Sequence, residues 1–211
     1  MTVGTPTRIA GGILAGGKGL RLGGVEKARL VLNGGSFLDH ALAALSPVTS
    51  SVAVALRPEQ EAPELPGGTA LVRDEVAAGT RSSPLAGVIA LLKWVESLGH
   101  ASHLLTLTVD TPFFGRSHAE RLARAEGPAP AYAAQGGDTH GLHTIWPVAL
   151  LPRLESLLAE APDSSVRKVL EGLGAMPCPF TPEDRQAFLN VNTPGDLEQA
   201  QRIAATGFAA E

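Results

Sequence analysis

The sequence predicts an α/β fold of three layers, with a mostly parallel sheet covered by helices on both faces. Short apolar runs typical of buried strands alternate with helix-forming segments from residue 8 to about residue 126. This alternation is typical of a parallel sheet with helices packed against it. A chain of 211 residues, 44% of them hydrophobic, is long enough for one domain with a sizeable core.

The strands and helices of the first half have clear local signals. Ser36 and Asp39 form a predicted capping box for a helix that begins after Gly35. Ser83 is the predicted cap of a longer helix, and Pro84 suits its first position. The predicted strands are 8–14, 51–56, 69–72 and 103–109, and the later helices are 84–98 and 117–126.

The second half of the chain is less regular. Thr193 is the predicted cap of a C-terminal helix, with Pro194 at its first position. Strands are expected at 130–134, 142–147, 175–180 and 188–191, and helices at 148–159 and 164–173. No internal repeat and no long linker divides the chain, so residues 1–211 are expected to form a single domain.

Composition and charge exclude several classes of partner. The net charge of −4 argues against a broad nucleic-acid surface, and the aromatic content of 4% argues against base stacking. The single cysteine, Cys178, can form no internal disulfide, which fits a reducing compartment. We find no signal-peptide pattern and no run of about 18 apolar residues, so we expect a cytoplasmic protein with no membrane partner.

A glycine-rich loop follows the first predicted strand, over residues 15–24. Glycines let backbone N–H groups approach phosphate oxygens without interference from a Cβ atom. Lys18, Arg21 and Lys27 add positive charge to the loop or just beyond it. The spacing fits neither the P-loop nor the dinucleotide-binding pattern. The loop therefore predicts a site for a nucleoside triphosphate, although a loop of this kind also fits a simple turn.

Two carboxylates follow predicted strands, Asp74 and Asp110. Ligands of an open parallel sheet bind beyond the carboxyl ends of its strands, and the glycine-rich loop has the same position. Mg²⁺ is commonly held by one or two carboxylates together with phosphate oxygens. The sequence therefore predicts a Mg²⁺ site at Asp110. Taken singly, Asp110 also fits an Asx-turn or a helix cap, and Asp74 also fits a solvated charged loop.

The glycine-rich loop also resembles a known signature. The run from Leu14 to Gly23, with Glu26-Lys27-Ala28 beyond it, is similar to the L-A-G-G-x-x-x-R-M-G…D-K signature of nucleotidyltransferases, and more narrowly of the molybdenum cofactor guanylyltransferases. The first motif is shared by many sugar and alditol nucleotidyltransferases, whereas the combination with the later segments is more specific. Those segments are Pro84-Leu85-Ala86-Gly87, Val109-Asp110-Thr111-Pro112-Phe113, Thr139-His140 with Trp146-Pro147, and Phe188 to Leu197.

The resemblance implies a Rossmann-like nucleotidyltransferase fold and a defined reaction. In such an enzyme, Mg²⁺-dependent transfer of GMP from GTP to the terminal phosphate of molybdopterin forms the guanine dinucleotide cofactor and releases pyrophosphate. Residues of about 1–115 would form the nucleotide-binding half, and residues of about 116–211 the acceptor-binding half. Transient contact with proteins that supply or accept the cofactor is also implied.

The resemblance also assigns roles to individual residues. Arg21, Lys27 and Asp110 match catalytic positions, and Asp110 matches the metal ligand. The positions matching nucleotide- and cofactor-binding residues are Leu14, Ala15, Gly16, Gly17, Lys27, Asp74, Asp110, Asn190 and Asn192. The two asparagines would lie near the pterin, although a turn and a helix cap explain them equally well.

Two further features leave alternatives open. Arg167 and Lys168 fit either a site for the pterin phosphate or a solvated helix face. Many guanylyltransferases have an asparagine at the strand end where the base binds, whereas this chain has Ala55-Leu56-Arg57-Pro58. A related enzyme that uses CTP or another nucleotide with a different cofactor or sugar-phosphate acceptor therefore remains an alternative. A non-catalytic nucleotide-binding protein is a third, and the presence of both Lys27 and Asp110 argues against it.

Overall fold

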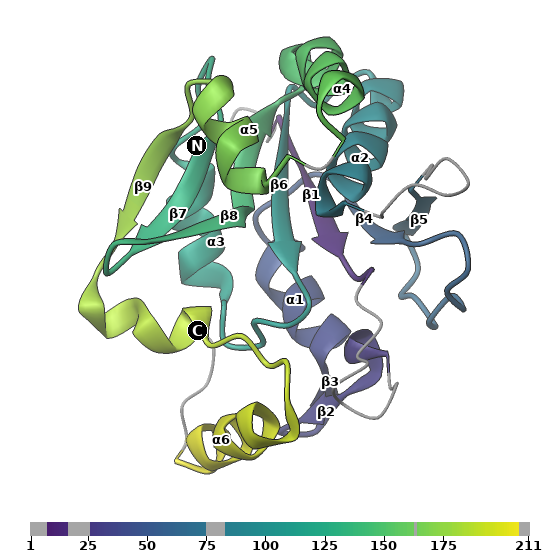
Figure 1. Cartoon of the computed structure of the whole chain (residues 1–211). Coiled ribbons are helices and arrows are strands. Elements are labelled where there is room, and N and C mark those ends of the chain that lie inside the picture. Colours follow the sequence, from purple (N-terminus) through teal and green to yellow (C-terminus); the bar gives the residue numbers. More distant parts are fainter. Residues whose placement is uncertain (1–7, 17–25, 75–82, 163, 207–211) are drawn as a thin grey trace, which may run out of the picture.

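A seven-stranded sheet forms the centre of the computed structural model, which describes residues 8–16, 26–74, 83–162 and 164–206. Figure 1 shows this sheet with helices on both sides. In spatial order the strands are β5 (Thr69–Arg73), β4 (Val52–Leu56), β1 (Ile9–Leu14), β6 (His103–Thr108), β8 (Asp138–Pro147), β7 (Ala131–Gln135) and β9 (Met176–Phe180). Only β8 runs against its neighbours, which confirms the mostly parallel sheet.

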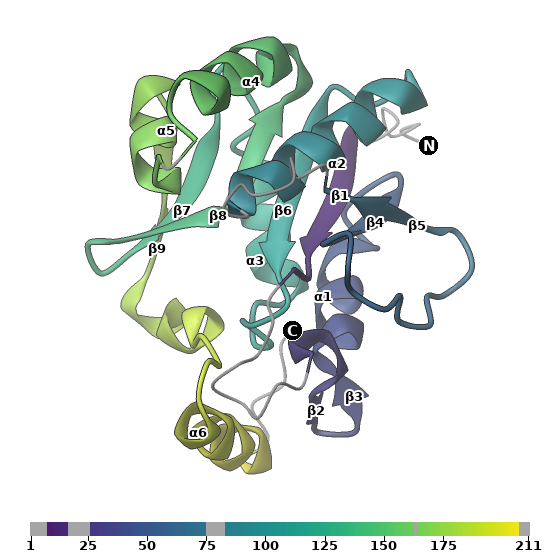
Figure 2. The ribbon, with the colours of Figure 1, turned by 45° about the vertical axis from the view of Figure 1, so that its right-hand side comes forward.

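Helices cover the two faces of the sheet and complete the three predicted layers, as Figure 2 shows from a second direction. One apolar cluster joins the sheet to α1 (Phe37–Leu45) and α3 (Arg116–Ala123). A second cluster joins the opposite face to α2 (Pro84–Leu98), α4 (Leu151–Glu160) and α5 (Val166–Gly172). The C-terminal helix α6 (Pro194–Ala205) packs beside the short strand β2 (Val31–Leu32).

The helix starts follow the capping signals of the sequence. The Ser36 side chain accepts from the backbone of Asp39, and the Asp39 carboxylate accepts from the backbone N–H of Ser36. Thr193 and Asp196 form the same arrangement at the start of α6. Helix α2 begins with the Ser83 cap and ends at Gly99, whose φ of 71° is left-handed. These predictions are confirmed.

The strand predicted at 188–191 is wrong. A 3-10 helix, η4 (Pro182–Phe188), occupies the start of this range, and Leu189 to Val191 cross the ends of the strands as irregular chain. Val191 is fully buried, and its N–H donates to the carbonyl of Asp110 at 2.8 Å. A single backbone hydrogen bond does not make a strand. The apolar residues of this segment are therefore explained by burial at the carboxyl ends of the strands.

Three other features differ from the sequence prediction. The helix expected at 148–159 is a 3-10 turn, η3 (Val148–Leu150), followed by α4, with Pro152 in the first turn of α4. Strand β8 begins at Asp138, earlier than expected, after a turn of two glycines with positive φ. A small hairpin of β2 and β3 (Gly35–Ser36) was not predicted, although Asn33-Gly34, both at positive φ, is a strong hairpin-turn signal.

No helix in the described ranges is both long enough and apolar enough to cross a membrane.

A buried hydrogen bond joins neighbouring strands in the sheet. The indole N–H of Trp146 donates to Oγ1 of Thr106 at 2.9 Å, and this hydroxyl donates to the carbonyl of Leu142 at 2.8 Å. Trp146 is 1% exposed and Thr106 is fully buried. A buried donor without a partner costs about 1–3 kcal/mol.

Thr106→Val keeps the shape of the side chain but removes the acceptor for Trp146. We expect the free energy of unfolding to fall by about 1–3 kcal/mol, measured by urea denaturation. Thr69→Val, on the half-buried edge strand β5, is the matched control and should change stability much less. Equal losses in both variants would contradict the role of this hydrogen bond.

Candidate active site

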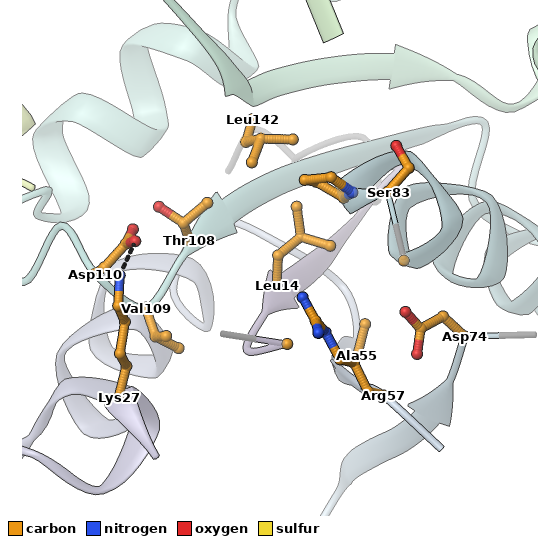
Figure 3. Close-up of a pocket in the computed structure, with 13 residues that line it drawn as sticks. Leu14, Lys27, Ala55, Arg57, Asp74, Ser83, Thr108, Val109, Asp110 and Leu142 are labelled. Carbon is orange, nitrogen blue, oxygen red and sulfur yellow. Dashed lines mark hydrogen bonds and ion pairs between the residues drawn. The ribbon is translucent and has the colours of Figure 1, made fainter. Parts of the chain in front are cut away.

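A pocket lies at the carboxyl ends of β1, β4, β5 and β6, the edge at which the sequence predicts a ligand. Figure 3 shows its lining, with Lys27 and Asp110 on one side and Arg57 and Asp74 on the other. Of the predicted site residues, five line this pocket: Leu14, Gly16, Lys27, Asp74 and Asp110. Gly17 and Arg21 lie outside the described residues.

The end of β1 forms the floor of the pocket. Leu14 is partly exposed to it, whereas Ala15 is 1% exposed and is buried behind the lining. The Ala15 N–H donates to the Ala55 carbonyl at 3.0 Å, which fixes the path of the chain into Gly16. Helix α2 packs closely against the end of β1. A Cβ atom on Gly87 would lie 2.9 Å from Cδ2 of Leu14. Gly87 therefore permits the close contact between helix and strand that shapes the pocket.

Lys27, Asp110 and Asn192 form a junction at one side of the pocket. The Lys27 ammonium group lies 2.8 Å from the Asp110 carboxylate and also donates to the side-chain oxygen of Asn192. Lys27 comes from the 3-10 helix η2 (Lys27–Arg29) and is only 9% exposed. Burial of this lysine is possible because its charge is paired and hydrogen-bonded.

The two predicted asparagines differ in position. Asn192 contacts Lys27 through its side chain, and its backbone N–H donates to Asp196 at 2.9 Å. This hydrogen bond and those from Thr193 lower the pKa of Asp196. Asn190 is exposed and lies outside the pocket lining. Asn192 thus combines a site contact with helix capping, whereas the structure gives Asn190 no contact with the pocket.

Asp74 is a buried carboxylate at the opposite side of the pocket. It follows β5 directly, and its N–H donates to the Leu56 carbonyl at 3.0 Å. Asp74 is 6% exposed, and its Oδ1 atom has no hydrogen-bond partner among the residues that the structure describes. Burial raises the pKa of Asp74, while the nearby Arg57 and Arg73 act in the opposite direction. A donor from a ligand would satisfy this carboxylate oxygen.

The sequence did not reveal two side chains that support the site. Gln60 is 8% exposed, and its amide donates to the Ala15 carbonyl while accepting from the Arg57 N–H. His143 is 3% exposed and hydrogen-bonds Thr111, the residue after Asp110, at 2.8 Å. The local sequence gives no signal for these contacts. Those of Gln60 with Ala15 and of His143 with Thr111 join segments more than 30 residues apart, and that of Gln60 with Arg57 depends on the loop conformation.

His140 and the basic pair of α5 have different surroundings. The His140 ring stacks on Phe188 with centroids 4.0 Å apart, and no hydrogen bond to its buried Nε2 is found in the described part of the chain. Arg167 pairs with Glu171 along the exposed face of α5, at 3.0 Å. Neither Arg167 nor Lys168 lines the pocket. The structure therefore supports the solvated-face interpretation for the basic pair.

The chain has clear relatives among known proteins. Residues 11–176 match the MobA-like NTP transferase domain family. A molybdenum cofactor guanylyltransferase from Acidiphilium cryptum is 41% identical over 189 residues, which cover 90% of this chain and 92% of the relative. One from Cereibacter sphaeroides is 37% identical over 197 residues, which cover 93% of this chain and 97% of the relative.

Solved structures show the same fold. Molybdopterin-guanine dinucleotide biosynthesis protein A from Archaeoglobus fulgidus superimposes with a TM-score of 0.70 at 21% identity, covering 93% of this chain and 99% of the other. A cytidylyltransferase from Thermus thermophilus, which acts on 2-C-methyl-D-erythritol 4-phosphate, gives a TM-score of 0.63 at 21% identity, covering 92% and 98%.

The fold is that of a nucleotidyltransferase, and the chain is an enzyme of this class. It belongs to the MobA-like NTP transferase family, and the relatives described above are molybdenum cofactor guanylyltransferases. The family and the enzyme class predicted from the sequence are confirmed. The roles of individual site residues stay predictions.

Buried His143 predicts a pH dependence of stability. Burial lowers the pKa of His143 from 6.5 to about 3. Between these values the unfolded chain binds a proton that the folded protein does not, so the free energy of unfolding falls as the pH decreases. His143→Gln removes this contribution, and the stability difference between pH 7 and pH 5 should become smaller.

Urea denaturation at several pH values measures this difference directly. His100→Gln is the matched control, because His100 is exposed. We expect the wild-type pH dependence in that variant. If His143→Gln keeps the full wild-type loss of stability at pH 5, the assignment to His143 is wrong.

Proposed function

We propose that this enzyme transfers GMP from GTP to the terminal phosphate of molybdopterin, forming the guanine dinucleotide cofactor and releasing pyrophosphate. The observation that carries the proposal is that one pocket contains Lys27 and Asp110 at one end and Asp74 at the other. The names of the relatives, at 33–41% identity over most of the chain, support guanine and molybdopterin as substrates.

The strand order supports one direction for the nucleotide. The sheet order β5-β4-β1-β6 separates Asp74 from Asp110 by three strand spacings, or about 14 Å. A nucleoside triphosphate lying along this edge would reach from one to the other. We assign the triphosphate to the end with Lys27 and the base to the end with Asp74.

The residues at the triphosphate end suit Mg²⁺. Asp110 already accepts a cation, the Lys27 ammonium group, at 2.8 Å. No group of three or more His, Cys, Asp or Glu side chains that could hold a metal occurs among the described residues, so the protein would supply few ligands. Mg²⁺ prefers such sites, with phosphate oxygens and water completing its shell. In the proposed reaction Asp110 would hold Mg²⁺, and the ion would supply positive charge at the phosphates.

Lys27 supplies a second positive charge from the protein itself. Its ammonium group has three N–H donors, of which Asp110 and Asn192 accept two in the described part of the chain. In this proposal the third donates to a phosphate oxygen, which lowers the repulsion between the two anionic substrates. The acceptor phosphate is already ionised, so the reaction needs positioning and charge more than a general base.

The acceptor side of the proposed site begins at Asn192. The segment from Phe188 to Asn192 crosses beside Asp110, where Val191 donates to the Asp110 carbonyl. We assign molybdopterin to this side, near Asn190 and Asn192, which agrees with an acceptor-binding half of about residues 116–211. A cytoplasmic location would suit the use of GTP, and contacts with cofactor-supplying or cofactor-accepting proteins belong to the same proposal.

Asp110→Ala removes the proposed metal ligand. We expect Mg²⁺-dependent pyrophosphate release from GTP and molybdopterin to fall at least about 100-fold, because the loss removes a charge interaction at the reacting phosphates. Asp138→Ala, at the exposed first residue of β8, is the control and should keep wild-type activity. Retained turnover in a folded Asp110→Ala variant would contradict the metal assignment.

Lys27→Ala removes the proposed triphosphate contact. We expect a higher KM for GTP and a lower kcat, with a combined loss in kcat/KM of about 10- to 1000-fold, as for other preorganised charges. Lys93→Ala on α2 is the matched control, since Lys93 pairs with Glu155 and is absent from this pocket. Unchanged steady-state kinetics in the Lys27 variant would remove it from the site.

A further inference from the structure

We propose that Arg57 selects the guanine base. In this proposal the Arg57 guanidinium group donates to guanine O6 and N7, while the Asp74 carboxylate accepts from N1–H and the N2 amino group. The inference rests on the proposed function, since it names the residue that would give that site its preference for GTP.

The backbone of Arg57 is held firmly in place. Its N–H donates to Oε1 of Gln60 at 2.9 Å, and its carbonyl accepts from the guanidinium group of Arg73 at 2.8 Å. The Gln60 amide also donates to the Ala15 carbonyl at 3.2 Å, and Arg73 also donates to the carbonyls of Pro58 and Gln60. These contacts tie the end of β4 to the ends of β1 and β5. A fixed backbone limits where the side chain can place its charge.

The Arg57 side chain lies inside the pocket. A Cβ atom on Gly16 would lie 3.4 Å from Arg57 Cγ and 3.6 Å from Nε, so the side chain passes directly over this glycine. Figure 3 shows the guanidinium group next to Leu14, with Asp74 on the far side of Ala55. Both Cβ distances are ordinary van der Waals distances, so the Arg57 side chain packs against the backbone of Gly16.

Asp74 supplies the complementary acceptor. Its Oδ1 is buried, and no described residue donates a hydrogen bond to it. A buried polar atom of this kind is stabilised when a donor arrives. The pocket therefore presents, near one another, a carboxylate that accepts and a guanidinium group that donates. Leu14, Ala55 and Leu142 form apolar parts of the same lining, suited to the faces of a planar ring.

Guanine matches this pair of groups better than the other bases. Its N1–H and N2 amino group are adjacent donors, and its O6 and N7 are adjacent acceptors that arginine binds in bidentate fashion. Adenine and cytosine place an exocyclic amino group where guanine has O6, so a donor would face the Arg57 donors. A site built to hydrogen-bond one base discriminates strongly against a base that leaves those groups unpaired.

The test combines Arg57 variants with modified nucleotides. Initial rates of pyrophosphate release with molybdopterin and Mg²⁺ give kcat/KM for GTP, ATP, CTP, 7-deaza-GTP and ITP. The proteins are the wild type, Arg57→Ala, Arg57→Lys and the matched control Arg116→Ala, an exposed arginine on α3. Nucleotide binding without the acceptor, measured by calorimetry, gives a second readout that does not depend on the chemical step.

We expect wild-type enzyme to prefer GTP and Arg57→Ala to lose roughly 10- to 100-fold in kcat/KM for GTP. Arg57→Lys should lie between the two, because it keeps the charge but loses the bidentate geometry. Rates with ATP and CTP should change far less. The penalty for 7-deaza-GTP, which lacks N7, should disappear in Arg57→Ala, since the two changes remove the same contact. The penalty for ITP, which lacks the N2 amino group, should persist there.

Two results overturn the inference alone. One is a wild type that prefers GTP while Arg57→Ala lowers kcat/KM equally for GTP, ATP and CTP, as a phosphate-binding arginine would. The other is an undiminished 7-deaza-GTP penalty in a folded Arg57→Ala variant. A wild type that prefers CTP, or that releases no pyrophosphate with molybdopterin, overturns the proposed function and the inference with it.

Discussion

The contact of Lys27 with Asp110 and Asn192 is the interaction on which the rest of this site depends. It joins residues 83 and 165 positions apart in the sequence. Lys27 follows the glycine-rich loop, Asp110 follows β6, and Asn192 precedes α6. The contact therefore forms one side of the pocket and holds the chain just before α6. Figure 1 shows α6 beside β2 and β3.

The burial of this contact explains why it needs all three residues. An ammonium group at a residue that is 9% exposed is stabilised only when it is paired and hydrogen-bonded. Asp110 supplies the opposite charge, and the amide of Asn192 accepts a second hydrogen bond. In the proposed function the Lys27 ammonium group would also meet the negative charge of the phosphates. The same few atoms that stabilise the fold would then bind the substrate.

The sequence predicts the parts of this structure that depend on local signals. Ser36, Ser83 and Thr193 act through neighbouring backbone groups, so their helices could be predicted. The strand-end position of Asp110 also follows from an apolar run and a topological rule. The contacts of Gln60 and His143 could not be found in this way, since their partners are brought near only by folding. The wrong strand prediction at 188–191 has the same cause. Its apolar residues indicate burial, but Val191 hydrogen-bonds the carbonyl of Asp110 and not a neighbouring strand.

The arrangement of the pocket separates two tasks of a nucleotidyltransferase. Lys27 and Asp110 lie at the ends of elements on one side of β1, whereas Arg57 and Asp74 follow β4 and β5 on the other. Charge recognition of phosphates is common to every nucleotide, but hydrogen bonding to the base is specific to one. In the proposed function, a change at the end of β4 would therefore alter the preferred base without disturbing the reacting phosphates. Arg57 and Asp74 together would complement both edges of guanine, because a guanidinium group donates hydrogen bonds and a carboxylate accepts them.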